Sequence, residues 1–124
     1  MPRADLPTVG DCLLAIAAAG ERLADATIRE MQLEDQRALV KDEAIGRLRV
    51  AGERSVTAAE KVIEKDPLYM EHRQAQYRAI RERIRARAEY DGAVLAARLT
   101  IELGEALNAA PAPIEPSGDL RRAG

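Results

Sequence analysis

The chain contains no Phe, no Trp and only three Tyr among its 124 residues, whereas Ala is its commonest residue. Large aromatic side chains supply much of the area that ordinary protein cores bury. Their scarcity, together with a charged fraction of 32%, predicts thin contacts between helices in place of a wide globular core. The length suits a single domain.

Residues that carry catalysis or bind metals are equally scarce. Cys12 is the one cysteine, so neither a disulfide framework nor a cysteine-based metal site is available, and its apolar surroundings predict a buried structural thiol. His72 is the one histidine and lies between Glu71 and Arg73, where we expect an exposed surface residue. The sequence has no HExxH motif, no glycine-rich phosphate loop and no nucleophile elbow. We therefore predict that the chain is not an enzyme and requires no cofactor or metal.

Long hydrophobic runs and an excess of one charge are also missing. The apolar run 12–19 is too short to span a bilayer, and no cleavable signal pattern precedes it. We expect a soluble protein of the cytoplasm with no membrane partner. Of the 19 basic residues 16 are Arg, but the net charge is −2, so the overall charge does not by itself indicate a nucleic-acid-binding protein.

The strongest pattern that is present is a long helix in the second half of the chain. Asp66 followed by Pro67 is typical of an N-cap and a first-turn proline, because that proline has no amide to leave unsatisfied and its φ is already helical. Apolar residues then recur about every 3.6 positions, and the next proline is Pro111. The pattern predicts a helix over 67–109, on the order of 60 Å long. One apolar stripe is expected to pack on another part of the chain: Tyr77, Ile80, Ile84, Ala88, Leu95, Leu99, Leu103 and Ala106.

A first helix over about 9–51 is predicted by the same criteria. Thr8 to Asp11 has the spacing of a capping box with Asp in place of Glu, and Gly52 suits the position that ends a helix. Gly20 indicates a bend or a close approach by a neighbouring helix. The apolar stripe of this helix comprises Leu13, Ile16, Gly20, Leu23, Thr27, Met31, Leu33, Val40, Ala44, Leu48 and Ala51.

Between the two long helices, the segment from Thr57 to Glu60 has the spacing of another capping box and predicts a short helix over 57–65. The fold is therefore expected to be all-α: a long antiparallel helical hairpin with a short connector helix, formed by residues 8–109. In such a hairpin, two residues that face each other are expected to have residue numbers whose sum is roughly 118. Residues 1–7 are expected to form a loose lead-in and 110–124 a Pro-rich disordered tail.

A two-helix hairpin buries only one helix–helix contact, and small cores are marginally stable without help. Large apolar residues remain near those ends of the two long helices that come together at the open end of the hairpin. We therefore predict that the chain self-associates into a homo-oligomer through its open end, using Leu13, Leu14, Ile16, Val94, Leu95, Leu99 and Ile101.

Two groups of basic residues are candidates for binding a polyanion. The first is a band within 72–87, where Glu82 is the only acidic residue beside Arg73, Arg78, Arg81, Arg83, Arg85 and Arg87. Arginine contacts phosphate oxygens bidentately. The alternative is that this band pairs with the acidic residues of the first helix and fixes the register of the hairpin, facing Glu30, Glu34, Asp35, Asp42 and Glu43.

The second group surrounds the connector, where residues at the tip of a hairpin face solvent and are free to meet a partner. It comprises Lys41, Arg47, Arg49, Arg54, Lys61 and Lys65, interspersed with Glu53, Glu60 and Glu64. A mixed solvated surface is therefore the alternative to a binding site. Tyr69 and Tyr77 are interpreted as packing residues, with stacking on nucleobases as the alternative.

The order of features over residues 28–103 is a charged helix that ends in the segment 44–48, a turn containing Gly52, the segment 55–61, an acidic turn at 65–66, and a long helix with Tyr77 and an apolar run near its end. This order resembles that of the UvsY-type recombination mediators, a class of small phage recombination accessory proteins. In that family a Lys/Arg pair just before the glycine turn contacts DNA. Arg47 matches the arginine of the pair, whereas the lysine has no clear counterpart, and Arg49 is its candidate substitute.

The resemblance implies helical hairpins that assemble into a ring through their open ends and bind single-stranded DNA. It also implies help in loading a recombinase onto strands covered by a single-strand-binding protein, in a host cytoplasm if the chain is phage-encoded. Our leading hypothesis is thus an oligomeric recombination mediator that holds DNA through the connector cations. The alternative is a non-enzymatic protein-interaction module, a scaffold or inhibitor of a protein partner that does not bind DNA.

Overall fold

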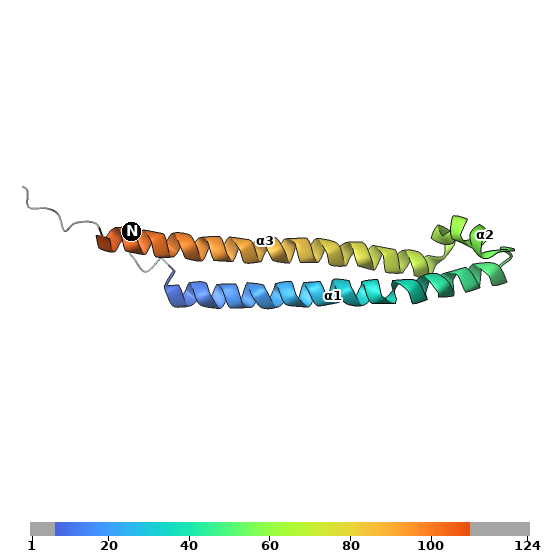
Figure 1. Cartoon of the computed structure of the whole chain (residues 1–124), viewed down its shortest axis with the longest axis horizontal. Helices are drawn as coiled ribbons and strands as arrows, with labels where there is room; N and C mark the ends of the chain where they lie inside the picture. The colour runs from blue at the N-terminus through green and yellow to red at the C-terminus, as the bar shows by residue number, and fades with distance from the viewer. Residues whose placement is uncertain (1–6, 110–124) are drawn as a thin grey trace, which may run out of the picture.

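The computed structural model describes residues 7–109, which form a helical hairpin (Figure 1). Helix α1 (Val9–Val50) runs antiparallel to helix α3 (Pro67–Ala109), and the short helix α2 (Val56–Lys61) and a 3-10 turn, η2 (Ile63–Lys65), connect them. The all-α hairpin expected from the sequence is confirmed. The expectations for residues 1–6 and for the tail 110–124 lie outside the described residues.

Local capping sets the two ends of α1. The Asp11 amide donates to Thr8 Oγ1 (3.0 Å) and the Thr8 amide donates to Asp11 Oδ2 (3.1 Å), which is the expected capping box. At the other end Gly52 has a φ of 128°, a conformation that costs little only for glycine. The amides of Gly52 and Glu53 donate to the carbonyl oxygens of Arg49 (3.2 Å) and Leu48 (3.1 Å), as in a Schellman motif.

The N-cap of the connector helix lies two residues earlier than the sequence pattern indicates. Ser55, with an extended backbone, is the N-cap of α2, and its Oγ accepts from the Ala58 amide at 3.1 Å. Thr57 therefore lies inside the helix, and the predicted capping box at Thr57 is wrong. A hydroxyl that lies three residues before a free amide serves as a cap whether or not a glutamate follows. Helix α2 ends at Lys61, and the chain reaches Lys65 through the tighter turn η2.

The two long helices meet along a narrow contact, which we call the seam. Its positions alternate in steps of three and four residues, the heptad spacing that keeps one face of a helix against its partner. All seam side chains except that of Arg37 are buried or half-buried. The seam consists of Cys12, Ile16, Ala19, Leu23, Ala26, Glu30, Leu33, Arg37, Val40 and Ala44 on α1, and of Gln76, Ala79, Arg83, Ala86, Tyr90, Ala93, Ala97, Thr100 and Gly104 on α3.

The apolar stripe expected on α3 is not the face that packs on α1. Of its eight residues only Ile80 is half-buried, and the other seven are exposed, including Ile84 and Leu99. The seam of α3 instead uses small side chains such as Ala79, Ala86 and Ala97, which allow the helices to approach closely. The stripe expected on α1 agrees better with the structure, because most of its members, Leu33 among them, are buried or half-buried.

The register between the arms also differs from the expected one. That register places Glu30 opposite Ala88, whereas Arg83 donates to Glu30, and Gln76 donates to Glu34 at 3.2 Å. The shift exceeds one helical turn. It arises because α3 starts beside Arg47, one turn before α1 ends, so the last turn of α1 extends past α3 toward the connector (Figure 1).

Candidate functional site

Arg47, one of the predicted connector cations, forms a bidentate ion pair within the hairpin. Its Nε donates to Asp66 Oδ1 (2.8 Å) and its Nη2 to Asp66 Oδ2 (2.7 Å). Asp66 is only 4% exposed and also caps α3 by accepting from the Tyr69 amide (2.8 Å), as expected of an N-cap before Pro67. These contacts tie the last turns of α1 to the first turn of α3.

The electrostatics of this pair follow from the same bonds. The hydrogen bonds from Arg47 lower the pKa of the Asp66 carboxyl below its ordinary value, and the Tyr69 amide acts in the same direction, while burial opposes both. The hydrogen bond to Asp66 in turn raises the pKa of the Arg47 guanidinium. Both groups are thus held in their charged forms, and the guanidinium of Arg47 already has its anionic partner.

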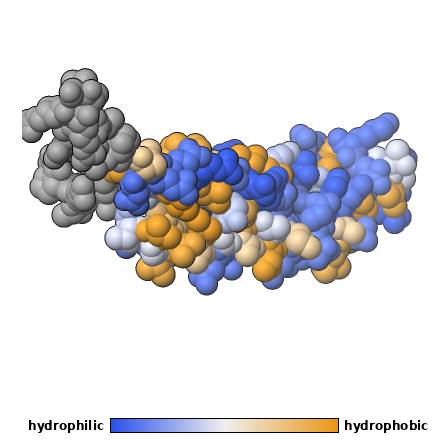
Figure 2. All heavy atoms as spheres, turned by 60° about the vertical axis from the view of Figure 1, so that its left-hand side comes forward, coloured by the Kyte–Doolittle hydropathy of each residue, from blue (hydrophilic) through white to orange (hydrophobic). Residues whose placement is uncertain are grey.

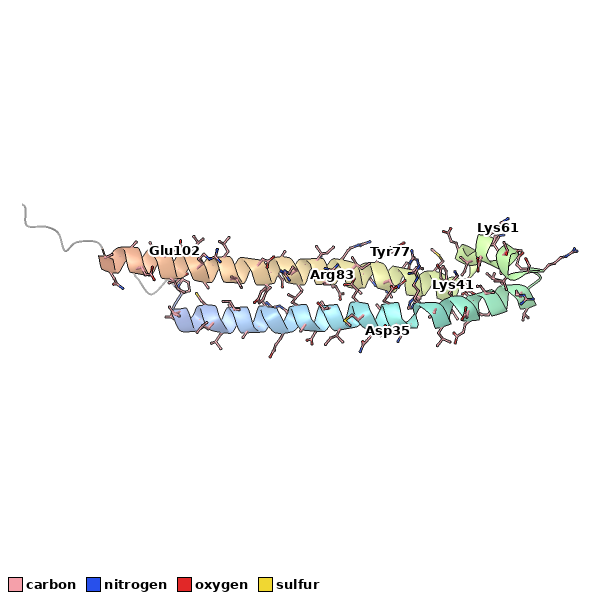
Figure 3. The ribbon with its side chains drawn as sticks, in the orientation of Figure 1. Asp35, Lys41, Lys61, Tyr77, Arg83 and Glu102 are labelled. Carbon is pink, nitrogen blue, oxygen red and sulfur yellow. The ribbon has the colours of Figure 1, made fainter. Side chains whose placement is uncertain are left out.

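The other connector cations remain available. Arg49, Arg54, Lys61 and Lys65 are exposed, whereas Lys41 is half-buried. Within residues 7–109 none of these five takes part in an ion pair; the five ion pairs found there use Arg22, Arg37, Arg47, Arg83 and Arg87. Figure 3 shows Lys61 on α2 at the end of the hairpin, and Lys41 on α1 closer to the middle. Four of the six predicted cations are therefore exposed and without an ion pair at the connector end of the described chain. Arg47 lies at the same end but is already paired with Asp66.

Only one arginine of the band 72–87 bonds across the hairpin. Arg83 forms an ion pair with Glu30 of α1, and Figure 3 places its label between the two long helices. Arg87 pairs with Asp91 of its own helix (3.3 Å), and Arg73 donates to Tyr77 Oη (2.7 Å). The expected pairing of the whole band with the acidic arm is therefore limited to Arg83. The exposed members without an ion pair among the described residues are Arg78, Arg81 and Arg85.

The open end of the hairpin exposes most of the apolar residues that we expect to mediate self-association. Five of them are between 44% and 71% exposed: Leu13, Leu14, Leu95, Leu99 and Ile101. Ile16 and Val94 are half-buried, Ile16 because it belongs to the seam. In Figure 2, hydrophobic surface gathers over the half of the hairpin nearer this end, and hydrophilic surface predominates toward the connector. The open end therefore offers apolar surface to a partner.

The burial of Cys12, His72 and two of the tyrosines agrees only in part with the expectations from the sequence. Cys12 is buried, as expected of a structural thiol. His72 is half-buried, so its expected exposure is wrong; its Nε2 is buried without a hydrogen-bond partner. His72 lines a hollow of about 370 Å³ between the arms, together with Val40, Arg47, Leu68 and others. Tyr69 is half-buried, whereas Tyr77 is 49% exposed and lies outside the seam.

Residues 7–109 contain no group of three or more His, Cys, Asp or Glu side chains arranged to hold a metal ion. Neither long helix has a stretch apolar enough to cross a bilayer in this part of the chain.

Sequence reasoning identified the cap at Asp66 but missed its bond to Arg47, because that bond depends on how the connector folds back on α1. The heptad spacing of small residues on α3 was the available signal for the seam.

Comparisons of the chain with protein-family models, with curated proteins and with solved structures find no match. The candidate surfaces therefore rest on the geometry of the hairpin itself.

Proposed function

We propose that the chain is a non-enzymatic recombination accessory protein that binds single-stranded DNA as a homo-oligomer. It would help to load a recombinase onto strands covered by a single-strand-binding protein. The observation that supports this proposal most is the presence of exposed cations at the connector end, Arg49, Arg54, Lys61 and Lys65, without ion pairs among the described residues. Such side chains neutralise phosphates by displacing counterions, independently of sequence.

Assembly through the open end would strengthen weak contacts. Each hairpin offers few cations, but several hairpins on one strand convert successive contacts into intramolecular ones and raise the overall avidity. Leu14 and Leu99, both more than half exposed at the open end, supply apolar area for such an assembly. The antiparallel hairpin then separates the two tasks, because its assembling end and its connector end lie at opposite ends of the rod.

The DNA proposal is tested by fluorescence anisotropy of a labelled single-stranded oligonucleotide over a salt series. We expect affinity to fall steeply with salt, and the double variant Arg49→Glu/Arg54→Glu to weaken binding at low salt. Arg29→Glu, a charge reversal at an exposed residue of α1 outside the seam that takes part in none of the ion pairs among the described residues, is the matched control for Arg49→Glu alone and should change affinity less. If the folded wild-type protein fails to bind at low salt, the proposal is wrong.

The assembly proposal is tested by light scattering. Leu14→Asp/Leu99→Asp should reduce the molar mass of the particle, because a charge buried in an apolar interface is costly. Leu39→Asp, compared with Leu14→Asp alone, places the same charge at a residue that is 62% exposed outside the open end and should leave the mass unchanged. A wild-type protein that is monomeric at micromolar concentration contradicts self-association.

A second candidate function is a protein-interaction module, a scaffold or inhibitor that does not bind DNA. The exposed apolar side chains of the open end favour it, since exposed apolar patches mark protein-interaction sites as well as oligomer interfaces. The anisotropy series separates the two candidates: a folded protein that binds a protein partner through Leu95 and Leu99, but no oligonucleotide at low salt, is the interaction module.

A further inference from the structure

Helix α3 carries a compact group of exposed side chains that the connector site does not include. Two of them, Arg78 and Arg85, also line hollows that α3 shares with α1, where Glu43 and Asp25 are among the other lining residues. Tyr77, Arg78, Arg81 and Arg85 are all exposed, and we call them the arginine face. Residues three, four or seven positions apart lie on the same side of a helix, so these four side chains are neighbours. Arg78 and Arg85 are separated by about 10 Å along the helix axis. In Figure 3 the label of Tyr77 lies along the edge of α3 that faces away from α1.

Positive charge is more concentrated in the segment that carries this face than in the connector segment. The segment 72–87 contains six Arg and one acidic residue, Glu82, whereas the segment 41–65 contains six basic and five acidic residues. Glu82 lies one turn from both Arg78 and Arg85, so it weakens the face locally. Arg83 and Arg87 are engaged in ion pairs with Glu30 and Asp91, which leaves Arg78, Arg81 and Arg85 beside Glu82 on the face, an excess of two positive charges. The face therefore attracts a polyanion, as the connector cations also do.

The ring of Tyr77 gives the face a feature that a purely ionic surface lacks. The guanidinium carbon of Arg73 lies 5.0 Å from the ring centroid, and Arg73 Nη2 donates to Tyr77 Oη at 2.7 Å. These two contacts hold the ring in place, and the residue as a whole is 49% exposed. An exposed aromatic ring among cations is the combination by which proteins bind single-stranded nucleic acid, because bases stack on the ring while cations hold the phosphates.

We infer that the arginine face is the principal contact for single-stranded nucleic acid, with a base stacked on Tyr77 and phosphates held by Arg78, Arg81 and Arg85. This inference rests on the proposed binding of single-stranded DNA but moves its main site from the connector to the middle of α3. An acidic protein segment would satisfy the arginines alone. The exposed ring favours a ligand that has planar bases as well as negative charges.

The test compares two kinds of variant by anisotropy with a labelled thymidine oligonucleotide and with an abasic oligonucleotide of equal length. Tyr77→Ala should weaken thymidine binding about tenfold or more, because stacking on one ring is lost, and should barely change abasic binding. Tyr77→Phe keeps the ring and should bind nearly as the wild type does. Arg81→Gln should reduce the slope of log affinity against log salt by about 0.7, the value for one phosphate contact on a single strand.

A further variant tests for a gain in affinity. Glu82→Gln removes the acidic residue beside Arg78 and Arg85 and should tighten binding at low salt. Circular dichroism checks that each variant retains the helical content of the wild type. All three positions are exposed, so we expect the fold to tolerate these changes.

The outcomes separate the inference from the proposed function. If the wild type binds the oligonucleotide, and Tyr77→Ala and Arg81→Gln bind equally well while the connector reversals abolish binding, the inference is wrong and the proposed function stands. If the wild type binds neither oligonucleotide at low salt, both fail. If an acidic peptide competes fully, and Tyr77→Ala leaves thymidine binding unchanged, the face is an ionic protein-docking surface and the inference is again overturned.

Discussion

The connector end and the open end of the hairpin are built by different kinds of interaction. At the connector, directional polar contacts meet in a small volume: the Schellman motif at Gly52, the Ser55 cap and the bidentate bond between Arg47 and Asp66. At the open end the capping box of Thr8 and Asp11 is the comparable polar device, and large apolar side chains such as Leu14 remain exposed.

This difference assigns the two ends different tasks. Directional contacts at the connector specify where each arm stops and which residues of the arms face each other, because hydrogen bonds tolerate little displacement. Apolar surface is non-directional and roughly additive in area, so the open end suits contacts between hairpins. Folding should therefore depend on the connector more than on the open end.

The largest expected effect is that of Asp66→Ala. The substitution removes the N-cap of α3 and leaves the Arg47 guanidinium without its partner, and we expect the free energy of unfolding to fall by about 2 kcal/mol. Asp66→Asn keeps a cap acceptor and should cost less. Urea unfolding followed by circular dichroism measures both. If Asp66→Asn is as stable as the wild type, the ionic bond contributes nothing; if Asp66→Ala is as stable too, the connector is not the more dependent end.

Acidification should lower the free energy of unfolding, by less than the substitution Asp66→Ala does. Arg47 lowers the pKa of Asp66 in the folded protein below its unfolded value of 3.8. The stabilisation is therefore fully present above that value and is lost as the pH falls through the lower folded pKa. The pKa of Asp11 is also lowered, by its hydrogen bonds with Thr8. The urea midpoint should fall between pH 6 and pH 3 by more in the wild type than in Asp66→Asn; an equal fall in both would contradict the assignment to Asp66.

Gly52→Ala should destabilise the hairpin by about 1.5 kcal/mol, because a side chain disfavours the positive φ at this position. Gly46→Ala is the matched control. Gly46 lies within α1 with open space around its added Cβ, so the same change there should stabilise the protein by about 1 kcal/mol. Thermal unfolding measures the two shifts, which we expect to have opposite signs.

The smallest expected effect lies at the open end. Leu99→Ala removes a side chain that is 56% exposed and should change the stability of the isolated hairpin by no more than about 0.5 kcal/mol. Unfolding measured at decreasing protein concentration checks this value. A loss of stability that appears only at high protein concentration would show that Leu99 stabilises an assembly and not the single hairpin. A large loss at every concentration would mean that Leu99 supports the hairpin itself.

Local signals made the ends of the helices predictable. Thr8, Gly52 and Asp66 act on amides and carbonyls within a few residues, so their roles follow from sequence alone. The seam of α3 was not predicted, because a search for large apolar residues passes over alanine, and Gln76, Arg83 and Tyr90 occupy seam positions. The candidate site divides in the same way: the exposure of Arg49 and Lys61 follows from their place near the tip, whereas the bond of Arg47 to Asp66 depends on the path of the connector.

The heptad spacing of the seam has a consequence for how such a molecule can vary in length. A single residue inserted into α3 would rotate every later side chain by about 100° and would replace the small residues of the seam with their neighbours. Seven residues inserted into each arm at facing positions would preserve every partner and lengthen the rod by about 10 Å. The bond between Arg47 and Asp66 would be unchanged, because both insertions would lie on the same side of it, toward the open end. The distance between the connector and the open end is therefore adjustable only in whole heptads.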